Sequence, residues 1–495
     1  MSKRQVLNAL ISVFDKEGLD VLLDKMVDRK IHIFSTGGTQ KFIEQKGVAV
    51  SAVEDLTSYP SILGGRVKTL HPKVFGGILA RREHPQDQEE VSSYDIPFFD
   101  LVIVDLYPFE ETLKAGGEHE DIIEKIDIGG ISLIRAAAKN YADVLVVPSK
   151  EHYPELLRIL ERGDYSTIEE RKKLSGHSFG ISASYDRLIQ SYLCGNEIKP
   201  LRYGENPHQK GAFYGNLSEV FDQLHGKELS YNNLLDVDAT VNYLKEFQEP
   251  TVAIVKHNNT CGIAIDDDQT SAWKNALASD PLSAFGGIVG LNTKVEKKTA
   301  EEINDLFIEV ILAPDYDDEA LELLKSKKNR VILKTKDFSI SAKDFRSLLN
   351  GHLVQDKDLV TAQAKDIKIT SQRKPTENEK MDLLFAEKIA KNSKSNTIVL
   401  AKNQRLLGLG CGMTSRIDAL KHAIAKAKEF NLDLKGAVMA SDAFFPFADC
   451  VELAHKEGIV AAIHPGGSIR DKDSIAYCDQ NNMAMITTGK RHFKH

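Results

Sequence analysis

The stretch T-V-A-I-V-K-H-N-N-T-C-G, residues 251–262, joins an apolar run to a group of chemically active side chains. Its first five residues, Thr251–Val255, predict a short buried strand. Gly262 predicts a turn at the end of the stretch. Lys256 and His257 then stand where a strand stops and a loop begins, which is where open α/β sheets hold their ligands.

The Lys256–His257 pair has a chemical logic of its own. A histidine takes up a proton near neutral pH, and a neighbouring ammonium stabilises negative charge that develops in a transition state. An isolated pair of this kind is more often part of an ordinary exposed loop. Its interpretation therefore depends on the rest of the chain.

The overall composition is that of a globular protein and excludes several classes. The chain has 495 residues, 42% hydrophobic and 27% charged, which predicts two or three domains. The net charge of −8 gives no reason to expect a general nucleic-acid binder. A local basic pocket for a phosphorylated small molecule is compatible with it.

Cysteine usage and hydropathy indicate a reduced, cytoplasmic protein. The five cysteines are odd in number and contain no C-x-x-C pair, and the first residues carry no targeting sequence. We therefore expect no structural zinc. No apolar run approaches about 18 residues, so no transmembrane helix and no membrane partner are expected.

The N-terminal third alternates strand-like and helix-like segments over about 150 residues, which predicts a doubly wound parallel sheet. Ser35-Thr36-Gly37-Gly38-Thr39 lies between a predicted strand and a predicted helix. That position favours a phosphate site at the helix N-terminus, with a plain tight turn as the alternative. No G-x-G-x-x-G motif is present, so a dinucleotide is disfavoured.

Two further stretches of this third carry candidate ligand groups. Arg66 and Lys68 follow two glycines, where backbone can approach a ligand and an arginine can bind a phosphate through two nitrogens. D-I-G-G at residues 127–130 opens a helix that carries Lys139. Residues 149–199 are helical in pattern and rich in charge, and we interpret them as a connecting segment with a solvated face.

The C-terminal two thirds contain several glycine-rich loops and one aromatic turn. Gly408–Arg416 looks like a phosphate loop but lacks the spacing and the Lys-Ser/Thr ending of a P-loop, so ATP binding is only weakly indicated. Phe444–Phe447 is aromatic, as a core cluster would also be. No internal repeat stands out.

Each of these motifs is compatible with a purely structural role, but ten of them follow one another in the order of a known family. They read S-T-G-G-T, G-G-R-V-K-T-L-H-P, D-I-G-G, R-A-A-A-K-N, L-R-Y-G-E-N-P-H-Q, V-K-H-N-N-T-C-G, S-D-P-L-S-A-F-G-G, D-A-F-F-P-F-A-D, H-P-G-G-S-I-R-D and T-G-K-R-H-F. Over essentially its full length the chain resembles the bifunctional PurH family of purine biosynthesis, which joins an AICAR transformylase to an IMP cyclohydrolase.

The resemblance implies an α/β protein with three parts. Residues 1–148 would form the cyclohydrolase domain, similar to methylglyoxal synthase, and residues 149–199 the helical connection. Residues 200–495 would form the transformylase domain, from two subdomains similar to cytidine deaminase without its zinc. The missing H-x-E…P-C-x-x-C signature agrees with that.

The resemblance also implies two reactions. A formyl group passes from the co-substrate 10-formyltetrahydrofolate to the 5-amino group of AICAR (5-aminoimidazole-4-carboxamide ribotide), and the product, FAICAR, closes its ring with loss of water to give IMP. No metal or nucleotide cofactor is expected, and the family leaves room for a monovalent cation. A homodimer with transformylase sites at its interface is implied, and no nucleic acid partner.

Roles follow for positions that match the family's motifs. In formyl transfer His257 would be the base, Lys256 would stabilise the tetrahedral intermediate, and Asn396 would orient substrate or folate. The other expected contacts of that site are Arg202, Tyr203, His208, Arg416 and Phe444. The expected ring-closure groups are Lys68, Tyr107, Asp127 and Lys139. The expected phosphate and ribose contacts are Ser12, Lys16, Ser35, Thr36, Gly37, Gly38, Thr39, Arg66, Thr69, Gly129 and Gly130.

Three positions depart from the family's pattern. Asp105 stands where asparagine is usual, Thr260 where proline is usual, and Phe75 where histidine is usual. An ionised Asp105 cannot donate a hydrogen bond and would repel a nearby phosphate. Two alternatives therefore remain open: a transformylase whose cyclohydrolase half has decayed, and a non-catalytic phosphoribotide sensor.

Overall fold

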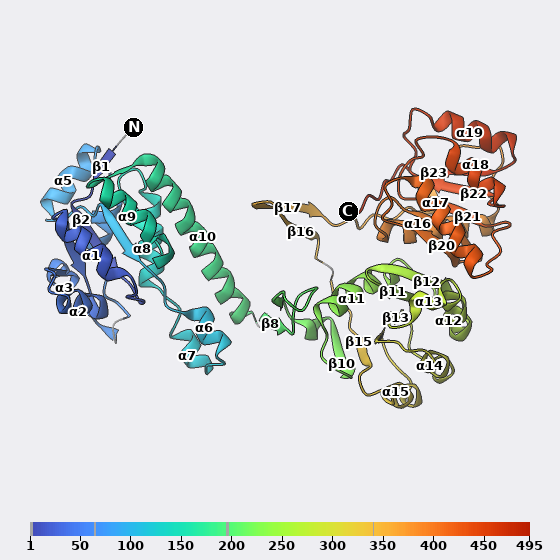
Figure 1. Ribbon diagram of the computed structural model, residues 1–495, viewed down its shortest axis with the longest axis horizontal. Coiled ribbons are helices and arrows are strands. Elements are labelled where there is room, and N and C mark those ends of the chain that lie inside the picture. The colour runs from blue at the N-terminus through green and yellow to red at the C-terminus, as the bar shows by residue number, and fades with distance from the viewer. Residues whose placement is uncertain (1–2, 64–65, 195–197, 340) are drawn as a thin grey trace. The chain divides into compact units, whose positions relative to one another are not determined.

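The computed structural model describes residues 3–63, 66–194, 198–339 and 341–495 of the chain (Figure 1). The chain divides into two compact units, Met1–Asn196 and Glu197–His495. Among the described helices, none is both long enough and apolar enough to cross a membrane.

The first unit is built on a five-stranded parallel sheet with the order β4-β3-β2-β5-β6. The chain runs outward from β2 to β4, then returns and runs outward from β5 to β6. The point of reversal lies between β2 and β5, where open α/β sheets hold ligands at the carboxyl ends of their strands. The predicted doubly wound parallel sheet is confirmed. The strands are β2 (Asn8–Ser12), β3 (His32–Ser35), β4 (Ser51–Ala52), β5 (Leu101–Val104) and β6 (Leu145–Val147).

Helices cover both faces of this sheet because alternate residues of each strand point to opposite sides. Ala9 and Ile11 pack with the helices of one face, and Leu10 packs with those of the other. The first face carries α1 (Leu19–Asp28), α2 (Gly37–Gln45) and α9 (Tyr153–Arg162). The second face carries α3 (Val53–Thr57), α4 (Pro72–Leu79) and α8 (Gly129–Lys139).

Residues 149–196 belong to this unit, which differs from the predicted separate connecting segment. Leu156, Ile159 and Leu160 of α9 are part of the sheet's core, as is Leu174 of the long helix α10 (Ile168–Leu193). Arg171 is fully buried and donates to the carbonyl oxygens of nearby backbone. Apart from Arg171, the charged residues of this segment lie mainly on the outer sides of α9 and α10. The inner side of α9 is apolar, and that of α10 carries Leu174, Tyr185 and three serines besides Arg171.

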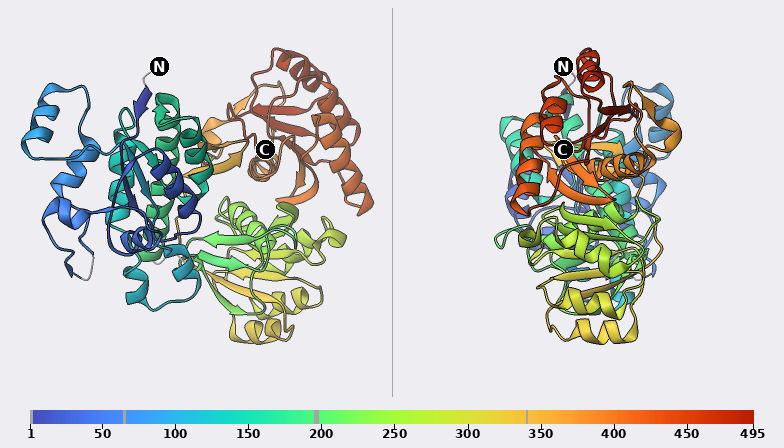
Figure 2. Two further views of the ribbon diagram at one scale, coloured as in Figure 1. Left: turned by 60° about the vertical axis from the view of Figure 1, so that its left-hand side comes forward. Right: turned by 90° about the vertical axis from the view of Figure 1, so that its right-hand side faces the viewer.

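The second unit contains one mixed sheet of 12 strands (Figures 1 and 2). Ten of them come from two copies of the same α-β-β-α-β-α-β-α-β pattern, and β10 (Phe221–His225) and β18 (Lys368–Ile369) add one strand at each edge. The first copy is α11 (Tyr231–Leu244), β11 (Thr251–Lys256), β12 (Asn259–Ile265), α12 (Gln269–Leu277), β13 (Ile288–Leu291), α14 (Lys297–Asn304), β14 (Val310–Ala313), α15 (Asp318–Lys325) and β15 (Val331–Thr335), with the short α13 (Pro281–Ala284) before β13. The second is α16 (Glu377–Asn392), β19 (Ile398–Lys402), β20 (Arg405–Gly410), α17 (Arg416–Glu429), β21 (Val438–Ser441), α18 (Asp449–Lys456), β22 (Ala461–His464), α19 (Asp471–Gln480) and β23 (Ala484–Thr487).

The two copies have the same strand order, β12-β11-β13-β14-β15 and β20-β19-β21-β22-β23. The two similar α/β subdomains that the family resemblance implies are confirmed, although no repeat stands out in the sequence itself. A fold constrains the spacing of apolar positions more than their identity, so two copies can share a topology without an obvious sequence period.

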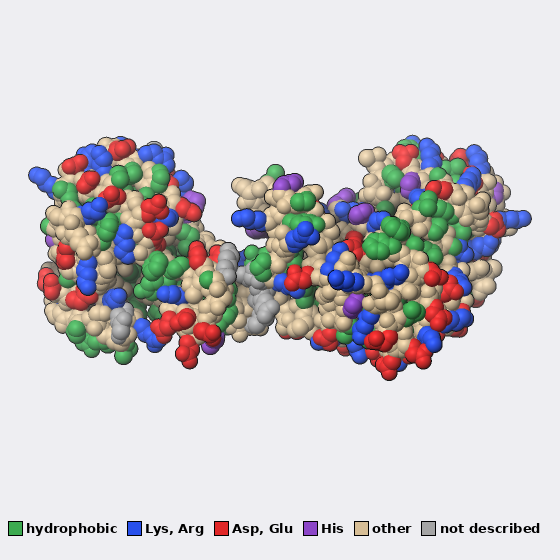
Figure 3. Space-filling view, turned by 60° about the horizontal axis from the view of Figure 1, so that its bottom comes forward, with side chains coloured by type: hydrophobic (Ala, Val, Ile, Leu, Met, Phe, Trp, Pro, Cys, Tyr) green, Lys and Arg blue, Asp and Glu red, His purple; other side chains and the backbone are tan. Residues whose placement is uncertain are grey.

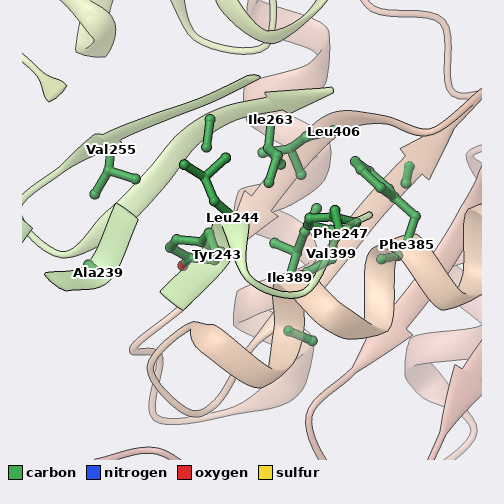
Figure 4. Packing of buried hydrophobic residues seen from close by; sticks show 14 of the residues in the cluster. Ala239, Tyr243, Leu244, Phe247, Val255, Ile263, Phe385, Ile389, Val399 and Leu406 are labelled. Atoms are coloured by element: carbon green, nitrogen blue, oxygen red, sulfur yellow. The ribbon is translucent and has the colours of Figure 1, made fainter. Parts of the chain in front are cut away.

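The copies meet where β12 pairs antiparallel with β20, at Ala264 and Arg405. On one side of this junction α11 and α16 pack together over both halves of the sheet. Figure 4 shows Tyr243, Leu244 and Phe247 meeting Phe385 and Ile389 in this shared core. The other face of each half has a separate core under its own helices.

Gly262 lies inside β12 and not in the predicted turn. A Cβ added there would lie 1.9 Å from the Ala276 carbonyl oxygen of α12, so the glycine permits close packing of helix on strand. Gly408 has the same role in the second copy, where the Ala423 carbonyl oxygen would be 2.2 Å away.

We predict that a fragment of residues 1–196 folds independently, because its sheet is covered on both faces by its own helices. Circular dichroism should show cooperative thermal unfolding. A matched fragment ending at residue 148 lacks α9 and α10, leaves one apolar face of the sheet partly open, and should aggregate or unfold without a transition. Equal stability of the two fragments would contradict the assignment of residues 149–196 to this core.

Candidate active sites

The first candidate site lies at the carboxyl edge of the five-stranded sheet. Ser12 ends β2, Ser35 ends β3, and α2 begins at Gly37 directly after it. Because parallel strands end at one edge, these residues lie together with the loop that follows β5. The unpaired N–H groups at the N-terminus of a helix can bind an anion at this edge.

Two lysines lie beside the N-terminus of α2. A Cβ added at Gly37 would be 3.3 Å from Lys68 Nζ, and one added at Gly38 would be 4.0 Å from Lys16 Nζ. Lys16 is held by the carbonyl oxygens of Val13 and Phe14, at 2.9 and 2.6 Å. Two ammonium groups at a helix N-terminus form a positive site on a chain of negative net charge, as a phosphate requires.

The hydroxyl groups of this loop hold its shape. Ser35 Oγ donates to the Ile11 carbonyl oxygen at 2.8 Å, and Thr39 Oγ1 to that of Val13 at 2.8 Å. Thr36 Oγ1 donates to Glu54 at 2.7 Å. The structure thus ties all three hydroxyls to the protein, and the backbone of the loop is what faces the edge of the sheet.

Asp127 organises the N-terminus of α8. Its carboxylate accepts from Gly130 N at 2.6 Å and Ile131 N at 3.3 Å. Burial raises the pKa of Asp127, and backbone N–H groups, including that of Tyr107, oppose the rise. Thr69 Oγ1 would lie 3.2 Å from a Cβ added at Gly129, so the Lys68–Thr69 segment reaches this helix as well.

Tyr107 completes the cluster. Its ring packs edge-on against Phe14 with centroids 5.6 Å apart, and its side chain is half-exposed. Burial and the charge of Asp127 both raise the pKa of the phenol, so it is a proton donor at neutral pH. Lys68, Tyr107 and Asp127 therefore all lie at the same edge of the sheet, and their role in ring closure stays a prediction.

One predicted member of this site, Lys139, lies away from it, and another, Arg66, is already paired with a carboxylate. Lys139 is exposed at the far end of α8, about 15 Å from Gly129 at a rise of 1.5 Å per residue. Arg66 is exposed and forms an ion pair with Glu124. Residues 64 and 65, the two glycines that precede Arg66 in the predicted phosphate loop, lie outside the described residues.

Asp105, the unusual residue after β5, turns its carboxylate toward the backbone of the loop after β2. It accepts from the N–H groups of Phe14 and Asp15, the latter at 2.9 Å. Burial raises its pKa, and these two hydrogen bonds act against the rise. The carboxylate thus shapes the loop that holds Lys16, and both its oxygens are already bonded to protein.

The other two departures are accommodated in the structure. Thr260 is buried, and its hydroxyl lies 3.0 Å from the carbonyl oxygens of both Ile254 and Gly262. Phe75 is partly buried against the core under α4 and α8.

The second candidate site begins at the turn between β11 and β12. Lys256 pairs with Asn259 across a two-residue turn whose residues, His257 and Asn258, have φ of 53° and 64°. Lys256 Nζ donates to the Phe285 carbonyl oxygen at 2.7 Å, while His257 is exposed. The predicted strand end is confirmed, with the tight turn placed at His257.

A cavity of about 280 Å³ opens beside this turn between the two copies. An ion pair across it, Lys426 to Asp280 at 2.9 Å, links α17 to the start of α13. Its lining comes from both halves: Lys256, His257, Asn259, Thr260, Cys261, Ser279, Asp280, Ser283, Leu406, Gly408, Leu409, Cys411, His422 and Lys426.

Arg416 and Asn396 lie further along the same edge of the sheet. Arg416 is nearly buried at the start of α17, with Nε 3.2 Å from Ser441 Oγ and Nη2 3.4 Å from Asp442. Asn396 Nδ2 donates to the carbonyl oxygens of Met413 and Thr414. Asn396 therefore holds the loop that leads into Arg416.

The remaining predicted contacts lie on loops of the same unit. Arg202 and His208 are exposed, and Tyr203 half-buried, in the connection between β8 (Ile198–Leu201) and β9 (Gly211–Tyr214). The Arg202 guanidinium lies 5.6 Å from the Tyr203 ring. Phe444 is partly exposed in the loop after β21, and its neighbour Phe445 is buried against His464.

Two residues without a predicted role, Phe285 and Phe493, contribute to this region. Phe285 fixes Lys256, and the Phe493 ring lies 5.6 Å from the Arg416 guanidinium. Phe285 belongs to the motif S-D-P-L-S-A-F-G-G and Phe493 to T-G-K-R-H-F, and neither motif by itself indicates a role for its phenylalanine. Among the described residues, no three His, Cys, Asp or Glu side chains are grouped as metal ligands would be.

Comparison with known proteins decides the family. Residues 137–426 match the family model described as "AICARFT/IMPCHase bienzyme", and residues 18–132 match the one described as "MGS-like domain". The chain belongs to the bifunctional PurH family. It is 57% identical to "Bifunctional purine biosynthesis protein PurH" of Bacteroides thetaiotaomicron, over 99% of both chains. Proteins with the same description from Aquifex aeolicus and Clostridioides difficile are 46% and 45% identical, over 99% and 100% of this chain and 100% of each relative.

We predict that Asp105→Asn leaves both family activities within about twofold of the native enzyme. An asparagine offers one oxygen where the loop presents two N–H groups, so thermal unfolding should occur about 2–4 °C lower, for a loss of about 1 kcal/mol. The two activities and the midpoint of unfolding are the measurements. A several-fold gain in cyclohydrolase activity would mean that the carboxylate faces the substrate after all.

Proposed function

We propose that this PurH-family chain catalyses its two reactions at the two sites described, one in each unit. The second unit transfers the formyl group of 10-formyltetrahydrofolate to AICAR, giving FAICAR and tetrahydrofolate. The first unit closes the ring of FAICAR with loss of water to give IMP. The observation that carries the proposal is the Lys256–His257 turn at the mouth of the cavity between the two copies.

In formyl transfer, His257 acts as the base. As the 5-amino nitrogen attacks the formyl carbon, the imidazole takes the proton that this nitrogen loses. Lys256 uses one N–H on the Phe285 carbonyl oxygen and has two more for the oxyanion of the intermediate. The intermediate collapses when the bond between carbon and folate nitrogen breaks, and the imidazolium returns the proton to that nitrogen.

Arg416 and Asn396 serve substrate binding at the same edge. A nearly buried guanidinium with Asp442 as its only ionic partner in the described structure retains N–H groups for a ribotide oxygen. Phe444 is partly exposed and available to a folate ring. Arg202, Tyr203 and His208, which lie in the connection between β8 and β9, are proposed to act across a dimer interface.

For ring closure, the α2 N-terminus with Lys16 and Lys68 holds the phosphate. The carboxamide nitrogen attacks the formyl carbon, the neutral Tyr107 phenol donates to the formyl oxygen, and Asp127 takes the nitrogen's proton. Asp127 then passes its proton to the new hydroxyl group, which leaves as water while the formamide nitrogen forms the C=N bond and gives its own proton back to Tyr107. Because Lys139 lies at the opposite end of α8, the proposal leaves it out of this chemistry.

A homodimer is supported by an unusual hairpin. β16 (Lys343–Leu348) and β17 (Gly351–Asp356) pair only with each other and are exposed on both faces (Figure 1). Phe345 and Leu353 are 73% and 60% exposed. A lone two-stranded hairpin is marginal in water, so these apolar faces need a covering surface. Elsewhere the charges are interspersed, as on the face in Figure 3. We propose a second copy of this chain as the cover.

A cytoplasmic location is also proposed. All five cysteines are free thiols, and burial raises the pKa of the thiol of Cys261, Cys450 and Cys478 to about 12, so they stay protonated and unreactive. No site for a monovalent cation is proposed.

His257→Ala should lower formyl transfer by roughly two to four orders of magnitude, because the base is lost. Ring closure of supplied FAICAR should not change, since that site is in the other unit. Asn403→Ala is the matched control, because Asn403 has the same turn position in the second copy. Tetrahydrofolate and IMP are measured separately; unchanged formyl transfer in His257→Ala would refute the site.

Phe345→Ser with Val354→Ser, two residues directly opposite each other in the hairpin, should dissociate the dimer. Light scattering should show the native protein at about twice 55.0 kDa and the double variant at lower mass, with formyl transfer reduced and ring closure retained. Val27→Ser, an exposed apolar position on α1, is the control. A native protein that is monomeric in solution would contradict the proposal.

A further inference from the structure

The turn that holds His257 is strained by its own backbone. His257 and Asn258 both have positive φ, at 53° and 64°, a region uncommon for residues other than glycine, although Asn and His adopt it more often than most. Two-residue hairpins of this type favour Asn-Gly, and here neither position is glycine. Something outside the turn must hold it in place.

Asp236, in the middle of α11, provides that support. Its carboxylate accepts from His257 N at 3.2 Å and from Asn258 N at 2.6 Å. Both N–H groups of the turn thus end on one side chain from a helix that is itself fixed in the shared core. Hydrogen bonds from N–H groups to a carboxylate are among the stronger ones in proteins.

The second copy contains the same interaction between an aspartate and a turn, but its turn has no histidine. Asp382 of α16 accepts from Asn403 N at 2.9 Å and Gln404 N at 2.6 Å, and these residues have φ of 54° and 50°. Asp236 and Asp382 are each the sixth residue of their helix. The scaffold is common to both copies, and the histidine is found at only one of the two turns.

We propose that Asp236 is a positioning residue for formyl transfer, which fixes the left-handed turn so that the His257 imidazole is held at the cavity beside Lys256. The proposal rests on the role of His257 given above. It adds that catalysis depends on a carboxylate that touches neither substrate nor folate.

The test is a graded series at the two equivalent positions: Asp236→Asn and Asp236→Ala, with Asp382→Asn and Asp382→Ala as matched controls. In the Asp236 variants kcat for formyl transfer should fall about 10- to 100-fold, more in alanine than in asparagine, while KM for AICAR stays within about threefold. The Asp382 variants should lose thermal stability to a similar extent and keep kcat. Ring closure, in the other unit, reports the amount of intact enzyme in every sample.

The outcomes separate this proposal from the function on which it rests. If His257→Ala abolishes formyl transfer but the two aspartate series lose equal activity, Asp236 has only a structural role. If Asp236→Asn shifts the acidic limb of the kcat/KM pH profile, the carboxylate acts on the charge of the imidazole and not through its position. An unchanged profile with lowered kcat is the expected result. If His257→Ala is itself active, the assignment of the base fails first.

Discussion

The pairing of β12 with β20 is the contact on which the second unit depends. It brings two copies of one fold into a single sheet and lets α11 and α16 bury a common core. Neighbouring strands from β11 to β21 are antiparallel across the junction. As a result, the C-terminal ends of β11, β20 and β21 and the N-terminal end of β19 lie at the same edge of the sheet. That edge carries His257, Asn396 and Arg416. The candidate transformylase site is therefore a consequence of how the copies are joined.

In the first unit the candidate site also lies at one edge of a sheet, but no duplicated fold is involved. Its strands are parallel, so their carboxyl ends share an edge without any duplication, and two helix N-termini open there. A net charge of −8 does not prevent anion binding, because Lys16 and Lys68 lie beside one of these termini and the helix contributes its own partial positive charge. Anion binding depends on the charged groups within a few Å of the ligand and not on the net charge of the chain, because more distant charges are screened.

Carboxylates that accept two backbone N–H groups recur at loops of both units. Asp105 holds the loop after β2, Asp127 the start of α8, Asp236 the turn with His257, and Asp382 its counterpart. Burial raises the pKa of Asp105, Asp127 and Asp382, and the N–H groups act against that rise. Each carboxylate fixes the path of a loop whose neighbouring side chains face the solvent or a cavity. Rigid loops of this kind position reactive groups at low cost in entropy.

The sequence by itself determined the parallel N-terminal sheet, the strand that ends at Lys256, and the family, because apolar periodicity and ordered motifs are local properties of the chain. Contacts between distant segments decided the rest. Gly262 reads as a turn until α12 is seen to pack on it. The charged residues 149–196 read as a connection until their apolar side is seen in the core. Lys139 matches a motif, but ten residues of helix carry it away from Gly129. The two similar subdomains were expected from the family alone, and no sequence period reveals them, since a fold preserves the spacing of its buried positions and leaves their identity free.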